Sequence, residues 1–203
     1  MKVFFRSVMA VLLWVATLNV HAQIAEKDPV QQVKQVSEQL MQKLEKDRVQ
    51  LEQDGAKVQA LAESLVFPYV DVTKMARFVM GSYWRTATPE EQKTFTDAFK
   101  KILINSYARS FLRMQIAQLE MTEARQGSGK NDVEVPVVVV EKSGNRIPVL
   151  FRLLPNGESW KVYDVEIQGI SLLLNYRAAY MLEIESKGLP TVIANMQAQA
   201  KGL

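Results

Sequence analysis

Asp164 and Glu166 are the acidic residues whose spacing could support acid–base chemistry. They lie two residues apart in a segment with a strand-like pattern, which places both carboxylates on the same face. A pair of carboxylates can act as a general acid and a general base. However, their predicted position at an open strand end is more typical of solvated side chains, and we therefore expect no catalytic role for this pair.

Other residue types that carry chemistry are few. The chain has no cysteine and one histidine, His21, which falls in a segment that we expect to be removed. These absences exclude disulfides, thiolate sites, Ser-His-Asp hydrolases and most transition-metal sites. No glycine-rich phosphate loop occurs, and Ser128, Gly129 and Lys130 fall in a predicted hairpin turn rather than between a strand and a helix. We expect no catalysis, no bound metal and no cofactor.

Residues 1–22 have the pattern of a secretory signal peptide. Lys2 and Arg6 precede an apolar run at 8–18, and Ala22 is the small residue expected before a cut. A run of 11 residues is too short to span the ~30 Å hydrocarbon core of a membrane. We therefore expect cleavage after Ala22 and export to the periplasm.

Residues 23–203 form a single predicted domain. They contain 23 basic and 22 acidic residues, and this net charge of +1 does not indicate nucleic-acid binding. The first part of the domain has helical periodicity and a later part is rich in strands. Each part carries apolar faces that it cannot bury alone, so one α+β domain is the simplest organisation.

Six helices are predicted from apolar residues at three- and four-residue spacing and from helix-start signals. The clearest start is at Thr88, Pro89 and Glu91, which combine a capping residue, a first-turn proline and a capping-box glutamate. Gly55 is predicted to end the first helix. The predicted ranges are 28–53, 58–66, 71–81, 88 to about 112, 171–186 and 189–200.

Four strands are predicted between the fourth and fifth helices, at 118–125, 133–142, 146–154 and 158–167. Short breaks rich in glycine and asparagine separate them, and Asn156 with Gly157 is the strongest hairpin signal. Short connections between successive strands predict an antiparallel meander.

The two middle strands are too apolar for a sheet with one wet face, in which apolar and polar residues should alternate. Val137 and Val139 share one face, and Val138 and Val140 share the other. Both faces must therefore be covered, either by helices alone or by helices that leave an apolar cavity for a ligand. Pro136 favours a bent strand, and bent strands form a cradle more easily than flat ones.

Two sequence blocks resemble the MlaC or toluene-tolerance family. The first is WRTATPEEQ at 84–92, and the second is W-x-V-Y-D-V-x-x-x-G-I-S at 160–171. The resemblance extends over about residues 30–200. It implies a periplasmic phospholipid carrier of the α+β class. Its helices would wrap around a curved four-stranded antiparallel meander sheet and enclose an apolar lipid cavity.

The resemblance also implies partners and a physiological role. Proteins of this family carry diacyl glycerophospholipid between an outer-membrane lipoprotein–porin complex and an inner-membrane ABC transporter complex. This transport maintains the lipid asymmetry of the outer membrane. Two alternatives stay open, namely a non-catalytic envelope adaptor protein with a filled core and a cavity enzyme of the ketosteroid-isomerase type with an Asp base.

The lipid-binding wall is expected to form on the two middle strands and at the end of the last strand. The middle strands present valine and phenylalanine in register, and Ile170 lies where the last strand passes into a helix. The expected wall residues are Val137, Val139, Val149, Phe151 and Ile170.

Overall fold

The structure, a computed structural model, describes residues 28–201, and the predicted signal peptide with His21 lies outside this range. No helix among the described residues is long and apolar enough to cross a membrane. Two short 3-10 turns, Phe67–Tyr69 and Gly81–Arg85, flank α3. The helices are α1 (Pro29–Gln53), α2 (Gly55–Leu65), α3 (Val72–Met80), α4 (Pro89–Arg113), α5 (Leu172–Lys187) and α6 (Leu189–Gln199).

Capping side chains begin three of these helices. The Thr88 hydroxyl accepts a hydrogen bond from Glu91 N at 3.2 Å, and the Glu91 carboxylate accepts one from Thr88 N at 2.8 Å. This confirms the predicted capping box of α4. Asp71 and Ser171 likewise accept hydrogen bonds from first-turn amides of α3 and α5.

The predicted boundary between the first two helices is wrong by a few residues. Gly55 does not end the first helix, because α1 ends at Gln53 and Gly55 is the first residue of α2. The Asp54 carboxylate accepts hydrogen bonds from Ala56 N at 3.0 Å and Lys57 N at 3.3 Å. Asp54 therefore caps α2 and stabilises its earlier start.

The sheet is the predicted antiparallel meander with two additional short strands. The strand order is β1-β3-β4-β5-β6, all pairs of these strands are antiparallel, and β2 also pairs with β3. The predicted strand at 118–125 divides at 122–124 into β1 and β2. The strands are β1 (Ile116–Met121), β2 (Arg125–Gln126), β3 (Val133–Glu141), β4 (Arg146–Asn156), β5 (Ser159–Ile167) and β6 (Ile170–Ser171).

A two-residue turn joins β5 to β6. Its residues, Gln168 and Gly169, have φ values of 52° and 82°. Two positive φ values are those of a type I′ hairpin turn, which glycine adopts at little cost. The turn brings Ile170 back against Ile167.

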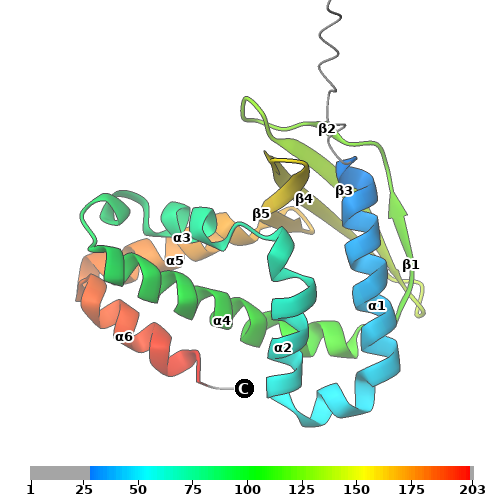
Figure 1. The fold of residues 1–203 in the computed structure, drawn as a ribbon, viewed down its shortest axis with the longest axis horizontal. Helices are drawn as coiled ribbons and strands as arrows, with labels where there is room; N and C mark the ends of the chain where they lie inside the picture. The colour runs from blue at the N-terminus through cyan, green and yellow to red at the C-terminus, as the bar shows by residue number, and fades with distance from the viewer. Residues whose placement is uncertain (1–27, 202–203) are drawn as a thin grey trace, which may run out of the picture.

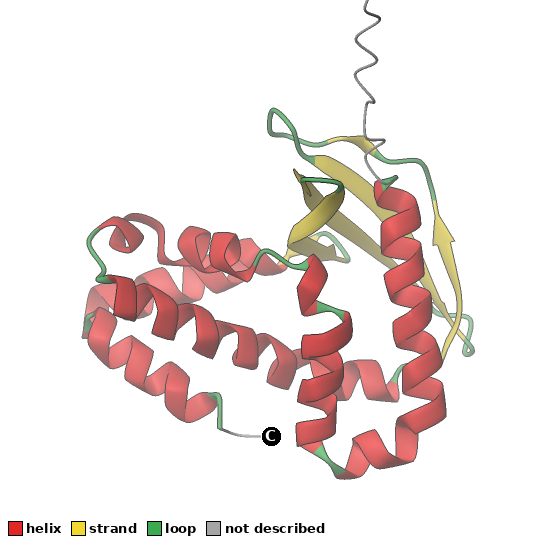
Figure 2. Cartoon of the chain, viewed as in Figure 1, coloured by secondary structure: helices red, strands yellow, loops and turns green. Residues whose placement is uncertain are grey.

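Helices α3 to α6 form a lobe beside the sheet, and α1 lies across one face of the sheet (Figures 1 and 2). The core of the lobe contains Phe95, Phe99 and Tyr180, whose rings contact one another. A smaller cluster joins α1, α2 and the end of α4. The core between α1 and the sheet is formed by Val33, Val135, Val137, Leu153 and Trp160.

Arg177 on α5 fixes this helix against the end of α3. Its guanidinium donates a hydrogen bond to Phe78 O and lies 4.9 Å from the centre of the Phe78 ring. Gly81, which ends α3 as predicted, has a φ of 57°, and a Cβ there would lie 3.0 Å from two guanidinium nitrogens of Arg177. The backbone conformation of Gly81, with a φ of 57° and a ψ of −124°, favours glycine at this position, and a larger residue would also displace the end of the Arg177 side chain.

Candidate functional site

The strand register places five apolar residues in one row across the sheet. Met121 pairs with Val137, Val137 with Val149, Val149 with Ile167, and Ile167 with Ile170. Directly opposed residues of paired strands have neighbouring side chains on the same face. This row, called the apolar row below, contains three of the five predicted wall residues.

The other two predicted wall residues lie in the adjacent rows. Val139 pairs with Ile147, and Phe151 pairs with Val135 and Val165. The structure therefore brings all five onto one face, the face that packs against α1. Sequence reasoning did not name Ile147, Val165 and Ile167 as wall residues. The alternation within their strands would have indicated them.

From β3 to β6, exposure increases along the apolar row. Val137 is 3% exposed beneath α1, Val149 and Ile167 are half-buried, and Ile170 is 62% exposed. Leu174, in the first turn of α5, is also an exposed apolar side chain. The row is therefore most buried at β3 and exposed at its open end on β6 and the start of α5, while Met121 at its other end on β1 is half-buried.

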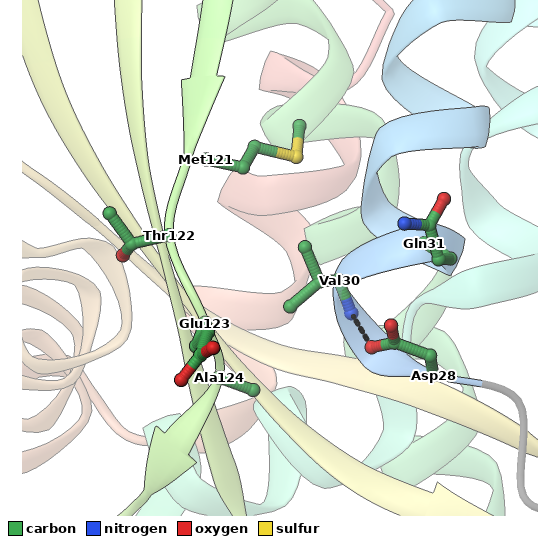
Figure 3. A pocket seen from close by; sticks show the side chains of 7 residues that line it. All are labelled: Asp28, Val30, Gln31, Met121, Thr122, Glu123 and Ala124. Carbon is green, nitrogen blue, oxygen red and sulfur yellow. Dashed lines mark hydrogen bonds between the residues drawn. The ribbon is translucent and has the colours of Figure 1, made fainter.

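Two pockets border α1 in the described part of the chain. One, of about 360 Å³, lies between the start of α1 and the break between β1 and β2. Figure 3 shows Met121 and Ala124 pointing toward Val30 in this pocket, and Asp28 and Glu123 add carboxylates to its lining. The second, of about 400 Å³, lies between α1 and α2. Neither includes the open end of the apolar row, so the predicted enclosed lipid cavity stays a prediction.

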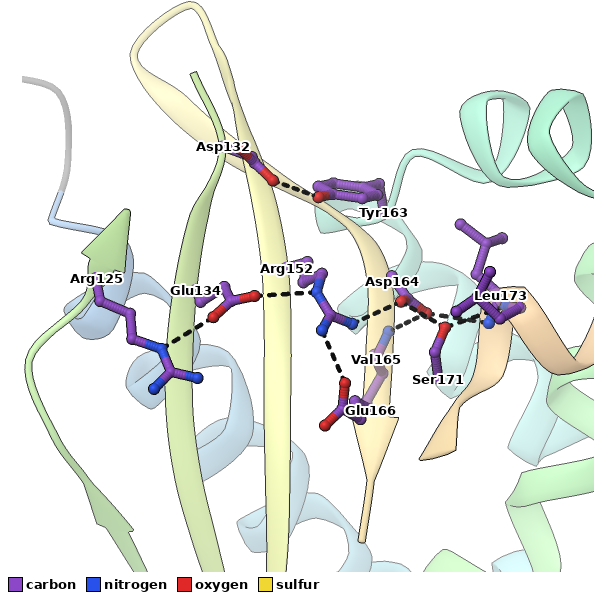
Figure 4. A network of polar contacts seen from close by, with 11 residues as sticks. Arg125, Asp132, Glu134, Arg152, Tyr163, Asp164, Val165, Glu166, Ser171 and Leu173 are labelled. Carbon is purple, nitrogen blue, oxygen red and sulfur yellow. Dashed lines mark hydrogen bonds and ion pairs between the residues drawn. The ribbon is translucent and has the colours of Figure 1, made fainter. Parts of the chain in front are cut away.

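The opposite face of the sheet carries a network of ion pairs centred on Arg152 (Figure 4). Its Nε donates to Glu134 at 3.1 Å, its Nη1 to Asp164 at 2.9 Å and its Nη2 to Glu166 at 2.7 Å. Burial lowers the pKa of Arg152, but the hydrogen bonds and charges of Glu166 and Asp164 outweigh burial and raise this pKa above its usual value.

The expectation that Asp164 and Glu166 are solvated is wrong for Asp164, whereas the Glu166 side chain is 26% exposed and pairs with Arg152. The Asp164 side chain is only 6% exposed, and it accepts hydrogen bonds from Ser171 Oγ at 2.7 Å and from Leu173 N at 3.0 Å besides that from Arg152. Both carboxylate oxygens are thus held by donors, two of which belong to the start of α5. Among residues 28–201, no group of three or more His, Cys, Asp or Glu is placed to hold a metal ion.

Tyr163 links the sheet to the helical lobe beside this network. It is the extra residue of a bulge in β5, and its hydroxyl donates to Asp132 at 2.6 Å (Figure 4). Its ring packs against the core of the lobe, with Lys74 Nζ 5.2 Å from the ring centre. Burial, and then the hydrogen bond to Asp132, raise the pKa of Tyr163 above its usual value.

These features define a class of α+β protein in which helices cover one apolar face of an antiparallel meander, while the acidic residues of the other face are tied into ion pairs. The chain belongs to the MlaC protein family, whose model matches residues 34–198. The resemblance carried by the two sequence blocks is therefore confirmed.

Characterised relatives and a solved structure are similar over most of the chain. The intermembrane phospholipid transport system binding protein MlaC of Haemophilus influenzae is 22% identical over 188 residues, which cover 91% of this chain and 88% of that protein. The toluene tolerance protein Ttg2D of Pseudomonas putida is 24% identical over 166 residues, which cover 81% of this chain and 77% of that protein.

The solved structure is that of a phospholipid-binding protein from Ralstonia solanacearum in complex with a phospholipid. It superposes with a TM-score of 0.78 at 24% identity and covers 86% of this chain and 97% of that one. The two proteins therefore share a fold.

Proposed function

We propose that this chain is a periplasmic carrier of diacyl glycerophospholipid. The main observation that supports this function is the apolar row, which includes the buried Val137 and extends to the exposed Ile170 on one face of the sheet. Membership of the MlaC family supports it, since one relative is a phospholipid transport binding protein. The structural relative from Ralstonia solanacearum binds a phospholipid on the same fold.

A carrier of this kind must replace the apolar contacts that a lipid has in a membrane. A buried CH₂ group contributes about 0.8 kcal/mol, so two chains of about 14 buried methylenes each need on the order of 20 kcal/mol of apolar contact. Val149, Phe151 and Ile167 are half-buried and offer such contact. The Arg152 ion pairs lie on the opposite face, so their charges do not enter the apolar face, where an unpaired charge would be costly.

The carrier acts without catalysis, metal or cofactor. The carboxylates of Asp164 and Glu166 are held by donors of the fold, which argues against an Asp base of the ketosteroid-isomerase type. The signal-like pattern of residues 1–22 supports a periplasmic location. Its partners are an outer-membrane lipoprotein–porin complex and an inner-membrane ABC transporter complex, and its role is to maintain outer-membrane lipid asymmetry.

The test is transfer of a labelled diacyl phospholipid between two vesicle populations in the presence of residues 23–203. We expect the transfer rate to rise in proportion to protein concentration. Val149→Asp, in the apolar row, should abolish the increase, and Val49→Asp, at an exposed position on α1, should retain it. Transfer no faster than in vesicles alone would refute the carrier function and favour the filled-core adaptor.

A further inference from the structure

The open end of the apolar row is a short piece of chain with little pairing of its own. Strand β6 contains two residues, and its only register pairs are Ile167 with Ile170 and Glu166 with Ser171. The next residue, Leu172, begins α5. The position of Ile170 therefore depends on what holds the junction of β6 and α5.

Asp164 on β5 is the side chain that holds this junction. Its Oδ2 accepts from Ser171 Oγ at 2.7 Å, and its Oδ1 accepts from Leu173 N at 3.0 Å (Figure 4). Ser171 in turn accepts from Leu174 N at 3.1 Å and caps the helix. A carboxylate at a helix N-terminus is also favoured by the helix dipole.

Arg152 keeps the Asp164 carboxylate in place from the other side. Its guanidinium bridges Glu134 on β3 with Asp164 and Glu166 on β5, so three strands are joined at this point. Ile170 and the Arg152 cluster belong to opposite faces of the sheet. The cluster therefore acts on the apolar face only through the backbone of β6 and α5.

We propose that Asp164 is a positioning residue for lipid release, because its bonds to Ser171 and Leu173 fix the junction of β6 and α5 and thereby the open end of the apolar row. This inference rests on the proposed carrier function.

The experiment measures release of a labelled diacyl phospholipid from loaded residues 23–203 to acceptor vesicles. Asp164→Asn keeps the size of the side chain but turns one acceptor oxygen into a donor, and Ser171→Ala removes the hydroxyl that Asp164 accepts from. Both should speed release about fivefold, the rate equivalent of one hydrogen bond of about 1 kcal/mol. Amide hydrogen exchange at Leu173 should rise in parallel.

Two matched variants separate positioning from general destabilisation. Ser171→Thr keeps the hydroxyl and should release lipid at the wild-type rate. Thr88→Ala removes the capping hydroxyl at the start of α4, away from the apolar row, and should also leave the release rate unchanged.

Unchanged release in both Asp164→Asn and Ser171→Ala would overturn the inference while leaving the carrier function intact. Equal acceleration in Thr88→Ala would also overturn it, since general stability would then set the rate. If Asp164→Asn does not fold, the comparison of release from Ser171→Ala and Ser171→Thr alone tests the inference. Wild-type protein that takes up no phospholipid would instead refute the carrier function, and this inference with it.

Discussion

Replacing Gln32 by alanine should destabilise the protein far more than most substitutions on a helix. Gln32 is buried on α1, its Nε2 donates to Trp160 O at 2.8 Å, and its Oε1 accepts from Trp160 N at 3.0 Å. The Gln32 side-chain amide thus makes the pair of backbone hydrogen bonds with Trp160 that a residue of a neighbouring strand would otherwise make. Removing the partner of a buried donor or acceptor costs about 1–3 kcal/mol, so losing both bonds should cost about 3 kcal/mol in total.

Thermal and urea unfolding of Gln32→Ala measure this cost. For a chain of this size each kcal/mol lowers Tm by about 2–4 °C, so the expected decrease is about 6–12 °C. Gln31→Ala is the matched control, because its exposed side chain should contribute less than about 0.5 kcal/mol. Equal losses of stability in the two variants would refute the role given to the Gln32 amide.

Three further predictions concern the ion pairs, the apolar row and the buried tyrosines. Arg152→Met should lose about 3 kcal/mol of unfolding free energy because it leaves partly buried carboxylates without their partner. Arg146→Met, which breaks an ion pair whose arginine is 55% exposed, should lose much less, and equal losses of the two variants in urea unfolding would contradict the greater contribution assigned to the Arg152 ion pairs. Val149→Asp and Ile170→Glu should lose bound phospholipid but keep the native circular dichroism spectrum; unfolding would show the residue to be core, and retained lipid would place the site elsewhere. Stability should fall as pH rises above about 10, where tyrosines of the unfolded chain ionise, because burial raises the pKa of Tyr180 to about 12 and the folded state keeps its proton. Unfolding can be followed between about pH 10 and 12 by the absorbance of ionised tyrosine. A free energy of unfolding that stays constant over this range would contradict the raised pKa of Tyr180.

Local sequence signals predict much of the fold, since they act within a few residues. The capping box at Thr88 and Glu91 marks the start of α4, and two-residue alternation assigns Val137 and Val149 to one face. The start of α2 at Gly55, three residues before its predicted start, could have been predicted in the same way, because Asp54 is a favoured capping residue.

The partners of Asp164 could not be predicted in this way. Its pairing with Arg152 depends on the register of β4 against β5, and that register shifts at the bulge that leaves out Tyr163. Its bonds to Ser171 and Leu173 depend on the turn at Gln168 and Gly169, which returns the chain toward β5. These contacts join β5 to β4, β6 and α5, and the residues next to Asp164 in the sequence do not indicate them.

The exposure of Ile170 is another property that follows from tertiary structure. Its position after the last long strand predicts a place at the edge of the apolar face, and the register confirms that it opposes Ile167. Which part of the row is covered depends on where α1 crosses the sheet, and α1 covers Val137 rather than Ile170. Helix placement over a sheet is set by packing between distant segments.

The carrier function is best tested by native mass spectrometry of the chain purified from the periplasm of expressing cells. Residues 23–203 should carry an added mass equal to a discrete number of diacyl phospholipids. Val149→Asp, purified in the same way, should lose this added mass while remaining folded. Wild-type protein that has only the mass of the bare chain and unfolds cooperatively would contradict the carrier function and support a filled core.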